Sequence, residues 1–331
     1  DTTGEWIAAR FEHDSSRPVN GYSAPQVHTH AVVLKITETP DGVSRTLQPQ
    51  EHFRTQRYAT AVYRAELAIR LQELGYEIER GEHGSPEIKG YSREYLEASS
   101  PRRAQIKEHL AEHHVSGAEA AQIAAHQTRE KKQNQSREEV LAKHQAMAEK
   151  YGSQPQKAVA RAHQNENSEP VERITPESAK NAIQTAINRN MEREAVVDER
   201  AILADALRHG MGSLRTDEAH AEFAKSIEAG HLIEVDAWPG SAGHAYTTPE
   251  MKELEADVLR HWSEGRDKHE SLAPDSIQNA ALASHAHLNE CQQSVVRAIL
   301  SNRDPIMALE GAAGTGQTTA LEAVCDAARQ A

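Results

Sequence analysis

One short run of the chain, VHTHAVVLKIT at residues 27–37, constrains both its local fold and its chemistry. β-Branched and apolar residues dominate the run, and this composition predicts a β-strand. Side chains at positions i and i+2 of a strand lie on the same face, so His28 and His30 project together. Val32 and Leu34 continue that face, and we therefore expect the histidine pair to lie beside a core.

A third histidine lies within reach of this pair. His13 comes just past a predicted first strand at residues 6–11, and the loop that follows contains proline and glycine residues that can fold the second strand back antiparallel. This would bring His13 opposite His28 and His30. Three imidazoles with a free coordination position are typical of a catalytic rather than a structural metal site. The spacing therefore predicts a metal site formed by these three residues.

The abundance of histidine weakens the pattern when it is taken alone. The chain has 19 histidines in 331 residues, so roughly one H-x-H triplet is expected by chance. A second triplet, His285-Ala286-His287, has no strand pattern around it, and we interpret it as the chance case. Spacing alone leaves open that His28 and His30 are ordinary strand residues that bind no metal.

Composition bounds the class of protein. The length allows two or three domains, and a hydrophobic content of 38% with 4% aromatic residues favours small cores joined by exposed helices. The net charge of −13 argues against a protein that coats DNA, although it permits a local basic groove. Cys291 and Cys325 cannot build a disulfide scaffold, and neither a signal peptide nor an apolar run of ~18 residues is present. We expect a cytoplasmic chain without a membrane span that starts internally, since it lacks an initial methionine.

The first 170 residues read as strands followed by helices. A turn at Pro40-Asp41-Gly42 leads to a short strand near Ser44–Leu47, and Pro49 opens an amphipathic helix over Gln50–Leu74. The later elements are predicted as a hairpin of Tyr76–Arg80 with Glu87–Tyr91 across Gly81–Gly84, a helix from Ser92, a helix at Arg102–His114, long exposed helices over 118–165 and a linker at Asn165–Pro170.

The second half is predicted to be mainly helical. Two helices within Thr175–Arg208 and a third at Asp217–Ala229 precede a hairpin of Leu232–Asp236 with His244–Thr248, around Pro239-Gly240. Helices followed by a two-stranded hairpin outline a winged-helix-like unit. The elements expected after it are a helix from Pro249 to about Gly265, a polar stretch over 266–284, a helix at Gln292–Leu300 and an apolar strand at Pro305–Leu309.

A glycine-rich loop follows the predicted strand. GAAGTGQTT at residues 311–319 fits the phosphate-loop pattern G-x-x-x-x-G-K-[ST] except that Gln317 stands where the pattern has lysine. Backbone N–H groups of such a loop cradle phosphates, and Thr318 would reach Mg²⁺. A neutral amide carries no charge toward the β- and γ-phosphates, so binding of ATP with Mg²⁺ is doubtful. The predicted nucleotide-binding residues are Gln292, Gly311, Gly314, Gly316, Gln317, Thr318 and Thr319.

Several stretches resemble the TrwC/TraI (MobF-type) conjugative relaxase-helicases. The strongest is the histidine region, where Thr29 departs from the hydrophobic residue that the family has between the two histidines; it faces away from the metal. Upstream of the glycine-rich loop, LNECQ at 288–292 resembles the adenine-reading glutamine motif of RecD-like helicases. The relaxase-like stretches are FEHDSSR (11–17), APQVHTHAVV (24–33), YATAVYRAELAIRLQELGYEIERG (58–81), PEIKGYSREYLEASSPRRAQI (86–106) and AAQIAAHQTREKK (120–132).

The resemblance implies metal-dependent, strand-specific DNA nicking, with Mg²⁺ or Mn²⁺ holding the scissile phosphate while a tyrosine attacks it. In the family the catalytic tyrosines, and an acidic residue that orients one histidine, lie upstream of the histidines. We expect both outside this chain, and we assign the nucleophile to none of Tyr22, Tyr58 and Tyr63. The implied partners are single-stranded DNA at a transfer origin, the missing N-terminal relaxase segment and accessory transfer proteins.

Basic residues near the middle of the chain are candidates for DNA contact. Arg102, Arg103 and Lys107 form one patch, and Arg129, Lys131 and Lys132 form another. A solvated helix face is the ordinary explanation for either patch, and nearby glutamates dilute the charge. The resemblance favours contact between the first patch and DNA phosphates.

We therefore predict an α+β chain of four parts. They are the C-terminal part of a relaxase domain with the metal site (1–115), a helical connector (116–170), a winged-helix-like helicase region (171–285) and the first βα unit of a RecD-like domain (286–331). The leading hypothesis is a relaxase-helicase fragment that is inactive for lack of its tyrosine. A decayed remnant that binds only DNA or metal, and a metal-binding α/β protein unrelated to DNA, remain alternatives.

Overall fold

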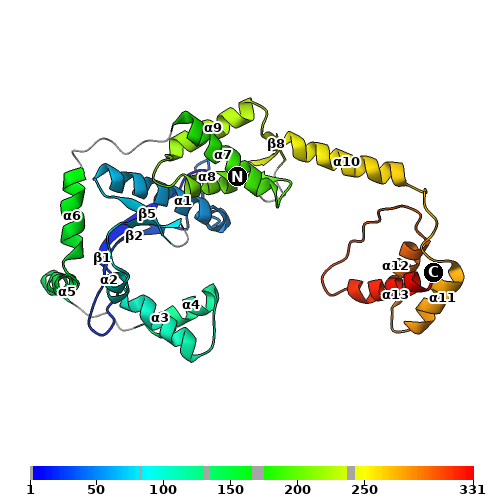
Figure 1. Cartoon of the computed structure of the whole chain (residues 1–331), viewed down its shortest axis with the longest axis horizontal. Helices are drawn as coiled ribbons and strands as arrows, with labels where there is room; N and C mark the ends of the chain where they lie inside the picture. Colours follow the sequence, from blue (N-terminus) through cyan, green and yellow to red (C-terminus); the bar gives the residue numbers. More distant parts are fainter. Residues whose placement is uncertain (1–2, 82–83, 130–134, 166–174, 237–242) are drawn as a thin grey trace. The chain divides into compact units, whose positions relative to one another are not determined.

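The computed structural model describes residues 3–81, 84–129, 135–165, 175–236 and 243–331 (Figure 1). The chain forms two compact units, residues 1–247 and 248–331. Helices dominate and the sheets are small and antiparallel, so the mixed helix-and-sheet class is confirmed. Parts of the predicted linker, of the second basic patch and of two predicted turns lie outside the described residues, namely 166–170, 131–132, 82–83 and 239–240.

The predicted histidine hairpin is present in the first unit. Strands β1 (Ala8–Ser15) and β2 (Pro25–Val33) pair antiparallel, and their register places His13 directly opposite His28. His13 thus lies within β1 and not just past it, because pairing with β2 continues beyond the aromatic residues that marked the strand in the sequence. The connecting loop is closed by an isolated pair of hydrogen bonds between Val19 and Tyr22.

A long helix follows this hairpin. After the short pair β3 (Thr37–Glu38) and β4 (Ser44–Arg45), helix α1 spans Gln50–Glu73, close to its predicted bounds. It buries small and branched residues, Ala65, Ala68 and Ile69, on one face. The hairpin of β5 (Ile78–Arg80) and β6 (Pro86–Ile88) comes next and pairs as predicted.

Five helices occupy residues 93–165. Ser92 caps the first of them by accepting a hydrogen bond from Tyr95 N, and Ser136 with Glu139 forms a capping box on the fourth. α3 packs against α4, while α5 is tied to the β1–β2 loop because His144 Nε2 lies 2.6 Å from Ser23 O. The helices are α2 (Arg93–Ala98), α3 (Pro101–Glu112), α4 (Ala118–Gln127), α5 (Arg137–Lys150) and α6 (Gln154–Asn165).

Three helices and a three-stranded sheet complete the first unit. The antiparallel sheet has the strand order β7-β9-β8, and helix α1 packs against α8 and α9. Branched side chains from α7 and α8, such as Ile183, Ile202 and Leu207, are almost completely buried. The elements are α7 (Pro176–Met191), β7 (Val197–Asp198), α8 (Glu199–His209), α9 (Thr216–Glu228), β8 (Ile233–Val235) and β9 (Ala245–Thr247).

The second unit, every residue of which is described, is helical and has no strand. The stretch described from the sequence only as polar contains a helix, because Ala281 and Leu282 supply an apolar face to the core around Val296. The predicted strand at Pro305–Leu309 is wrong: these residues are exposed and unpaired, since a parallel strand needs neighbours that this unit does not provide. The helices are α10 (Pro249–Gly265), α11 (Asp275–Ser284), α12 (Glu290–Ser301) and α13 (Gln317–Gln330).

Candidate functional site

The three predicted metal ligands lie together on one face of the β1–β2 hairpin. The ring centroids of His13 and His28 are 5.3 Å apart, and each lies 5.0 Å from the centroid of His30. Thr29 pairs with Glu12 on the opposite face, as the strand periodicity predicted. The cluster follows directly from the register, because His13 and His28 are cross-strand partners and His30 is two residues further along.

The spacing of the rings fits a shared metal ion. With a metal–nitrogen bond of about 2.1 Å and about 1.2 Å more to the ring centre, a metal lies about 3.3 Å from each centroid. Two centroids are then about 4.7 Å apart at a right angle and about 5.4 Å apart at the tetrahedral angle. The observed separations of 5.0–5.3 Å lie between these limits.

The ring orientations need adjustment before all three can bind one ion. The planes of His13 and His28 are only 19° apart, so the two rings stack and do not both aim at a common point. Rotation about χ2 of histidine is soft, and it can correct this at low cost. His28 already has a suitable tautomer, because its Nδ1 lies 2.9 Å from Gln26 O and can donate to it, which leaves Nε2 for a metal.

The surroundings of the cluster are more open than predicted. Val32 is 48% exposed and Leu34 is 45% exposed, so the expectation that the pair lies beside a core is wrong for the described residues. Phe11, which pairs with His30 on the same face, is also exposed. A two-stranded hairpin has too few neighbouring elements to bury an entire face.

The tyrosines of the chain make contacts elsewhere. The ring of Tyr22 packs edge-on to His144, and the hydroxyl of Tyr58 lies 2.7 Å from Nε2 of His220. Burial raises the pKa of both phenols, which disfavours the phenolate form that a nucleophile needs. Neither observation recommends Tyr22 or Tyr58 as a nucleophile.

The basic patch on α3 divides into two kinds of residue. The guanidinium of Arg102 donates to Thr128 O at 2.8 Å and to Thr128 Oγ1 at 3.0 Å, and it also reaches Ala125 O. Arg102 therefore holds the C-terminal end of α4, where carbonyl groups lack helical partners. Arg103 and Lys107 lie on the same helix.

A second histidine cluster on α3 escaped the sequence reading. Donor atoms of His109, Glu112 and His113 lie within 4.8 Å of one another, and the two rings have centroids 4.2 Å apart. The signal was present in the sequence, since residues at i, i+3 and i+4 of a helix share a face.

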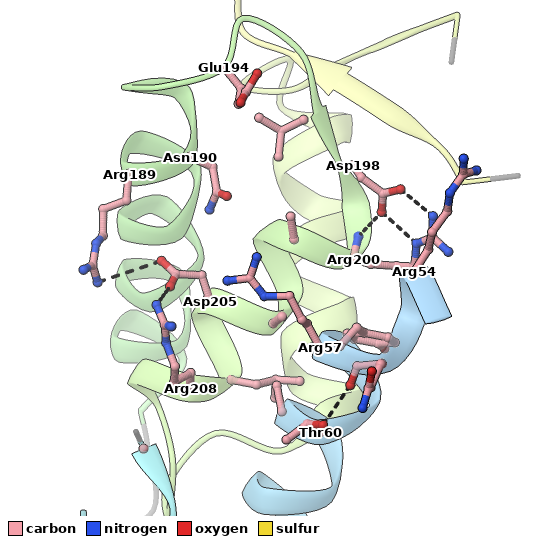
Figure 2. A pocket seen from close by; sticks show the side chains of 18 of the residues that line it. Arg54, Arg57, Thr60, Arg189, Asn190, Glu194, Asp198, Arg200, Asp205 and Arg208 are labelled. Carbon is pink, nitrogen blue, oxygen red and sulfur yellow. Dashed lines mark hydrogen bonds and ion pairs between the residues drawn. The ribbon is translucent and has the colours of Figure 1, made fainter. Parts of the chain in front are cut away.

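A cavity lined by arginines was not predicted from the sequence either. It has a volume of about 1330 Å³ and lies between α1 and the α7–α8 segment, as Figure 2 shows from close by. Four acidic side chains line it, but arginines outnumber them. The seven lining arginines are Arg54, Arg57, Arg64, Arg189, Arg193, Arg200 and Arg208.

An ion-pair network fixes one end of this cavity. Arg200 of α8 donates to Asp198 Oδ2 at 2.6 Å and to Glu51 Oε2 of α1 at 3.1 Å. The hydrogen bond from Arg200 lowers the pKa of Glu51. Burial would raise the pKa of Asp198, but the hydrogen bonds and charge of Arg200 outweigh it and lower that pKa. The network ties α1 to α8 and so holds the two walls of the cavity together.

The predicted nucleotide loop is present without its strand. Gly314 and Gly316 adopt positive φ, and Gly316 begins α13 from a left-handed conformation that favours glycine. The amide of Gln292 donates to Thr315 O at 3.1 Å, and that of Gln317 donates to Gly311 O at 3.2 Å. The structure thus joins the glutamine of α12 to the loop, while Gln317 folds back onto the loop itself.

The remaining predicted nucleotide residues lie at the start of α13. Thr318 and Thr319 occupy its first turn, directly after Gly316. By contrast, His285 of the second H-x-H triplet has both ring nitrogens engaged, since Nδ1 lies 3.0 Å from Ala281 O and Nε2 lies 3.3 Å from Asp326. The ring of His285 is thus engaged in contacts within the second unit.

Comparisons with known proteins found a family match at each end of the chain. Residues 1–151 match the sequence model of the TrwC relaxase family, and residues 287–331 match that of an AAA domain. The multifunctional conjugation protein TraI of Escherichia coli K12 is 33% identical over 141 residues, covering 40% of this chain and 8% of TraI. A second Escherichia coli TraI is 32% identical over 139 residues, covering 39% and 7%.

Solved structures of a conjugative relaxase TrwC are also similar. One is a complex with mutant OriT DNA, which is 37% identical with a TM-score of 0.43 and covers 46% of this chain and 54% of that one. A metal-bound complex with OriT DNA has the same identity and TM-score and covers 53% of its own chain.

Over residues 1–151 the chain is thus similar to the TrwC relaxases. The TraI matches support a relaxase segment of the TrwC/TraI type, and the AAA match fits the helicase part of such proteins. The chain spans only a small part of the length of the TraI proteins. No helix among the described residues is long and apolar enough to cross a membrane.

Proposed function

We propose that the chain contributes the metal cradle of a conjugative DNA relaxase, in which His13, His28 and His30 bind one divalent cation. The observation that carries the proposal is the β1–β2 register, which pairs His13 with His28 and sets three imidazoles 5.0–5.3 Å apart within the relaxase segment. A bound cation would hold a DNA phosphate and polarise its non-bridging oxygens.

The side chains of this chain would supply binding and orientation. The bond between His28 Nδ1 and Gln26 O fixes the ring tautomer and presents Nε2. Three nitrogen donors suit first-row transition cations better than Mg²⁺, which prefers oxygen ligands. We therefore propose that the site binds Mn²⁺ more tightly than Mg²⁺. Arg103 and Lys107 are proposed to contact phosphates of a single strand at a transfer origin, with Arg102 serving as an anchor for α4.

Strand cleavage needs a nucleophile that we assign to no residue of this sequence. The placements of Tyr22 and Tyr58 argue for packing roles. We therefore propose that the chain on its own binds metal and DNA but does not nick DNA, and that a segment bearing a tyrosine, together with accessory transfer proteins, acts with it. A decayed remnant that only binds DNA or metal is the second candidate, and the replacement of the loop lysine by Gln317 favours it.

For the remainder of the chain we propose the start of a helicase. Three helices with the sheet order β7-β9-β8 support a winged-helix-like unit within 171–285, and the glycine-rich loop with Gln292 supports RecD-like ancestry for 286–331. The division at residues 115, 170 and 285 is part of this proposal, as is a cytoplasmic location. Because the second unit has no strand beside its loop, we expect no ATP turnover from this chain.

The experiment measures metal-dependent DNA binding and nicking together. Fluorescence anisotropy of a labelled single-stranded origin oligonucleotide should report tighter binding with Mn²⁺ than with EDTA, and His28→Ala/His30→Ala should abolish that difference. Supercoiled origin plasmid should stay intact with the chain alone. If Mn²⁺ does not change DNA binding by the wild type, the three histidines do not form a metal cradle. If nicked circles appear, the chain contains a nucleophile after all.

A further inference from the structure

The arginine-lined cavity between α1 and α7–α8 has the character of a polyanion site. Its volume of about 1330 Å³ exceeds the roughly 300–1,000 Å³ typical of small-molecule sites, whose linings are mostly apolar. Here the lining includes seven arginines and, among the described residues, no lysine. Arginine forms planar, bidentate hydrogen bonds with phosphate and is preferred wherever phosphates are recognised in this way.

Some of these arginines have structural partners. Arg200 is held by Asp198 and Glu51, and Asp205 engages both Arg208 and Arg189. These pairs keep the walls together and neutralise part of the charge. They cannot account for the other guanidinium groups that face the same space.

Two arginines are left without such a partner. Among the described residues, no hydrogen bond or ion pair engages the guanidinium of Arg57 on α1 or of Arg193 after α7. Both residues are exposed, and Figure 2 shows Arg57 extending from α1 toward Asp205 and Arg208 on α8. Positive charges on both walls that are not paired with carboxylates repel one another. An anion bound between them would remove that repulsion.

We propose that this cavity binds the phosphate backbone of a DNA single strand, with Arg57 and Arg193 as the principal phosphate contacts. The occupant rests on the proposed function, since a relaxase handles single-stranded DNA, but the site is separate from the histidine cradle and from the α3 patch.

The test uses the full chain, a fluorescein-labelled oligothymidylate and a salt series without metal. Arg57→Ala/Arg193→Ala should weaken binding by about fivefold or more per arginine. It should also flatten the dependence of log K on log salt by about 1.4, since each phosphate contact on a single strand contributes about 0.7. The matched control, Arg93→Ala/Arg137→Ala, removes two exposed arginines outside the cavity and should change neither quantity by as much.

The outcomes separate this site from the cradle. Equal affinities and slopes for the two double variants would overturn the proposal. Because neither Arg57 nor Arg193 has a side-chain partner among the described residues, thermal unfolding should be unchanged, and a large loss of stability would reassign them to holding α1 on α8. Mn²⁺ titration of Arg57→Ala/Arg193→Ala should match the wild type, so failure of the cradle would leave this result standing.

The cluster on α3 carries a second proposal independently. Each ring has one nitrogen engaged with oxygen, since His109 Nε2 lies 3.1 Å from Gln127 Oε1 and His113 Nδ1 lies 2.9 Å from His109 O. Donation at these nitrogens leaves His109 Nδ1 and His113 Nε2 with lone pairs. With the Glu112 carboxylate nearby, the donor atoms lie within 4.8 Å of one another.

We infer that His109, Glu112 and His113 form a surface site for a borderline transition cation such as Zn²⁺ or Ni²⁺. Two imidazoles and a carboxylate are a common donor set for Zn²⁺, and exposure leaves a position open for water or an external ligand. The site uses a helix face alone, so it does not depend on the β1–β2 hairpin.

Calorimetric titration with Ni²⁺ tests the inference in a His28→Ala/His30→Ala background, where the strand cradle is absent. One equivalent should still bind, and His109→Ala/His113→Ala should remove it. His261→Ala is the control, because His261 likewise donates to a carbonyl of its own helix. Binding that persists without His109 and His113, or no binding in the starting background, would overturn the site.

Discussion

Loss of two strand histidines gives the sharpest prediction about the β1–β2 hairpin. A metal shared by three rings requires centroid separations of about 4.7–5.4 Å, and the observed values are 5.0, 5.0 and 5.3 Å. Closing the site requires rotation of the rings of His13 and His28, whose planes differ by 19°. We expect measurable but weak Mn²⁺ binding, because the hairpin is exposed and Mn²⁺ stands at the weak end of the divalent series.

The magnitude follows from the role of each ligand. Losing even a residue that only orients a metal ligand costs about 10- to 100-fold in affinity, so losing a direct ligand costs at least that much. His28→Ala/His30→Ala should therefore weaken Mn²⁺ binding by at least about 100-fold, which is about 2.7 kcal/mol. In a calorimeter, binding at the strand site should disappear.

The control is the same substitution in the other triplet. His285→Ala/His287→Ala removes an H-x-H pair in which His285 is already bonded through both nitrogens. It should leave Mn²⁺ binding unchanged, with circular dichroism verifying that both variants stay folded. Equal weakening by the two double variants, or no weakening by the first, would refute the assignment of the cradle.

The remaining predictions concern the ion pairs and the glycine-rich loop. Asp198→Asn keeps the cap of α8 but loses the ion pair with Arg200, which should lower the free energy of unfolding by on the order of 1 kcal/mol at neutral pH. Because the pKa of Asp198 is lowered, this difference in stability should vanish as the pH falls through the folded-state pKa. A difference that persists in acid would contradict the prediction. A hydrogen bond to Glu234 raises the pKa of His244, so Glu234→Gln should lower that pKa in an NMR titration. The small stabilisation that the pair gives the fold should be present in acid and lost as the pH rises through the folded-state pKa of His244. An unchanged pKa of His244 in the variant would disprove the pairing. Gln317→Lys should tighten binding of a fluorescent ATP analogue by about tenfold, since it restores a charged contact to phosphate, and no gain would count against a phosphate loop.

Local pattern predicted the elements that local pattern determines. The β1–β2 hairpin, the helix α1 and the turn of Gly316 into α13 all follow from periodicity, proline or glycine placement and strand composition. The histidine cluster could be predicted for the same reason, because a two-stranded register brings His13 to His28 without help from distant elements.

Features that depend on contacts between distant parts of the chain could not be predicted from local sequence patterns. Arg57 faces α8 because α1 packs against α8, where Glu51 meets Arg200, a residue 149 positions later, and no periodicity encodes such a contact. Leu34 is exposed although it follows a strand pattern, since burial needs a second layer that the hairpin does not receive. Pro305–Leu309 failed as a strand for a related reason, because an apolar run forms a parallel strand only beside other strands.

The most direct test of the cradle is whether its metal touches a DNA phosphate. The test uses the His109→Ala/His113→Ala variant, which lacks the proposed cation site on α3. Mn²⁺ and a single-stranded origin oligonucleotide are added to this variant, and electron–nuclear double resonance at phosphorus is recorded. A ³¹P coupling should appear and should disappear on adding His28→Ala/His30→Ala. If no coupling appears, or if it survives without His28 and His30, then the three strand histidines do not hold a metal against DNA.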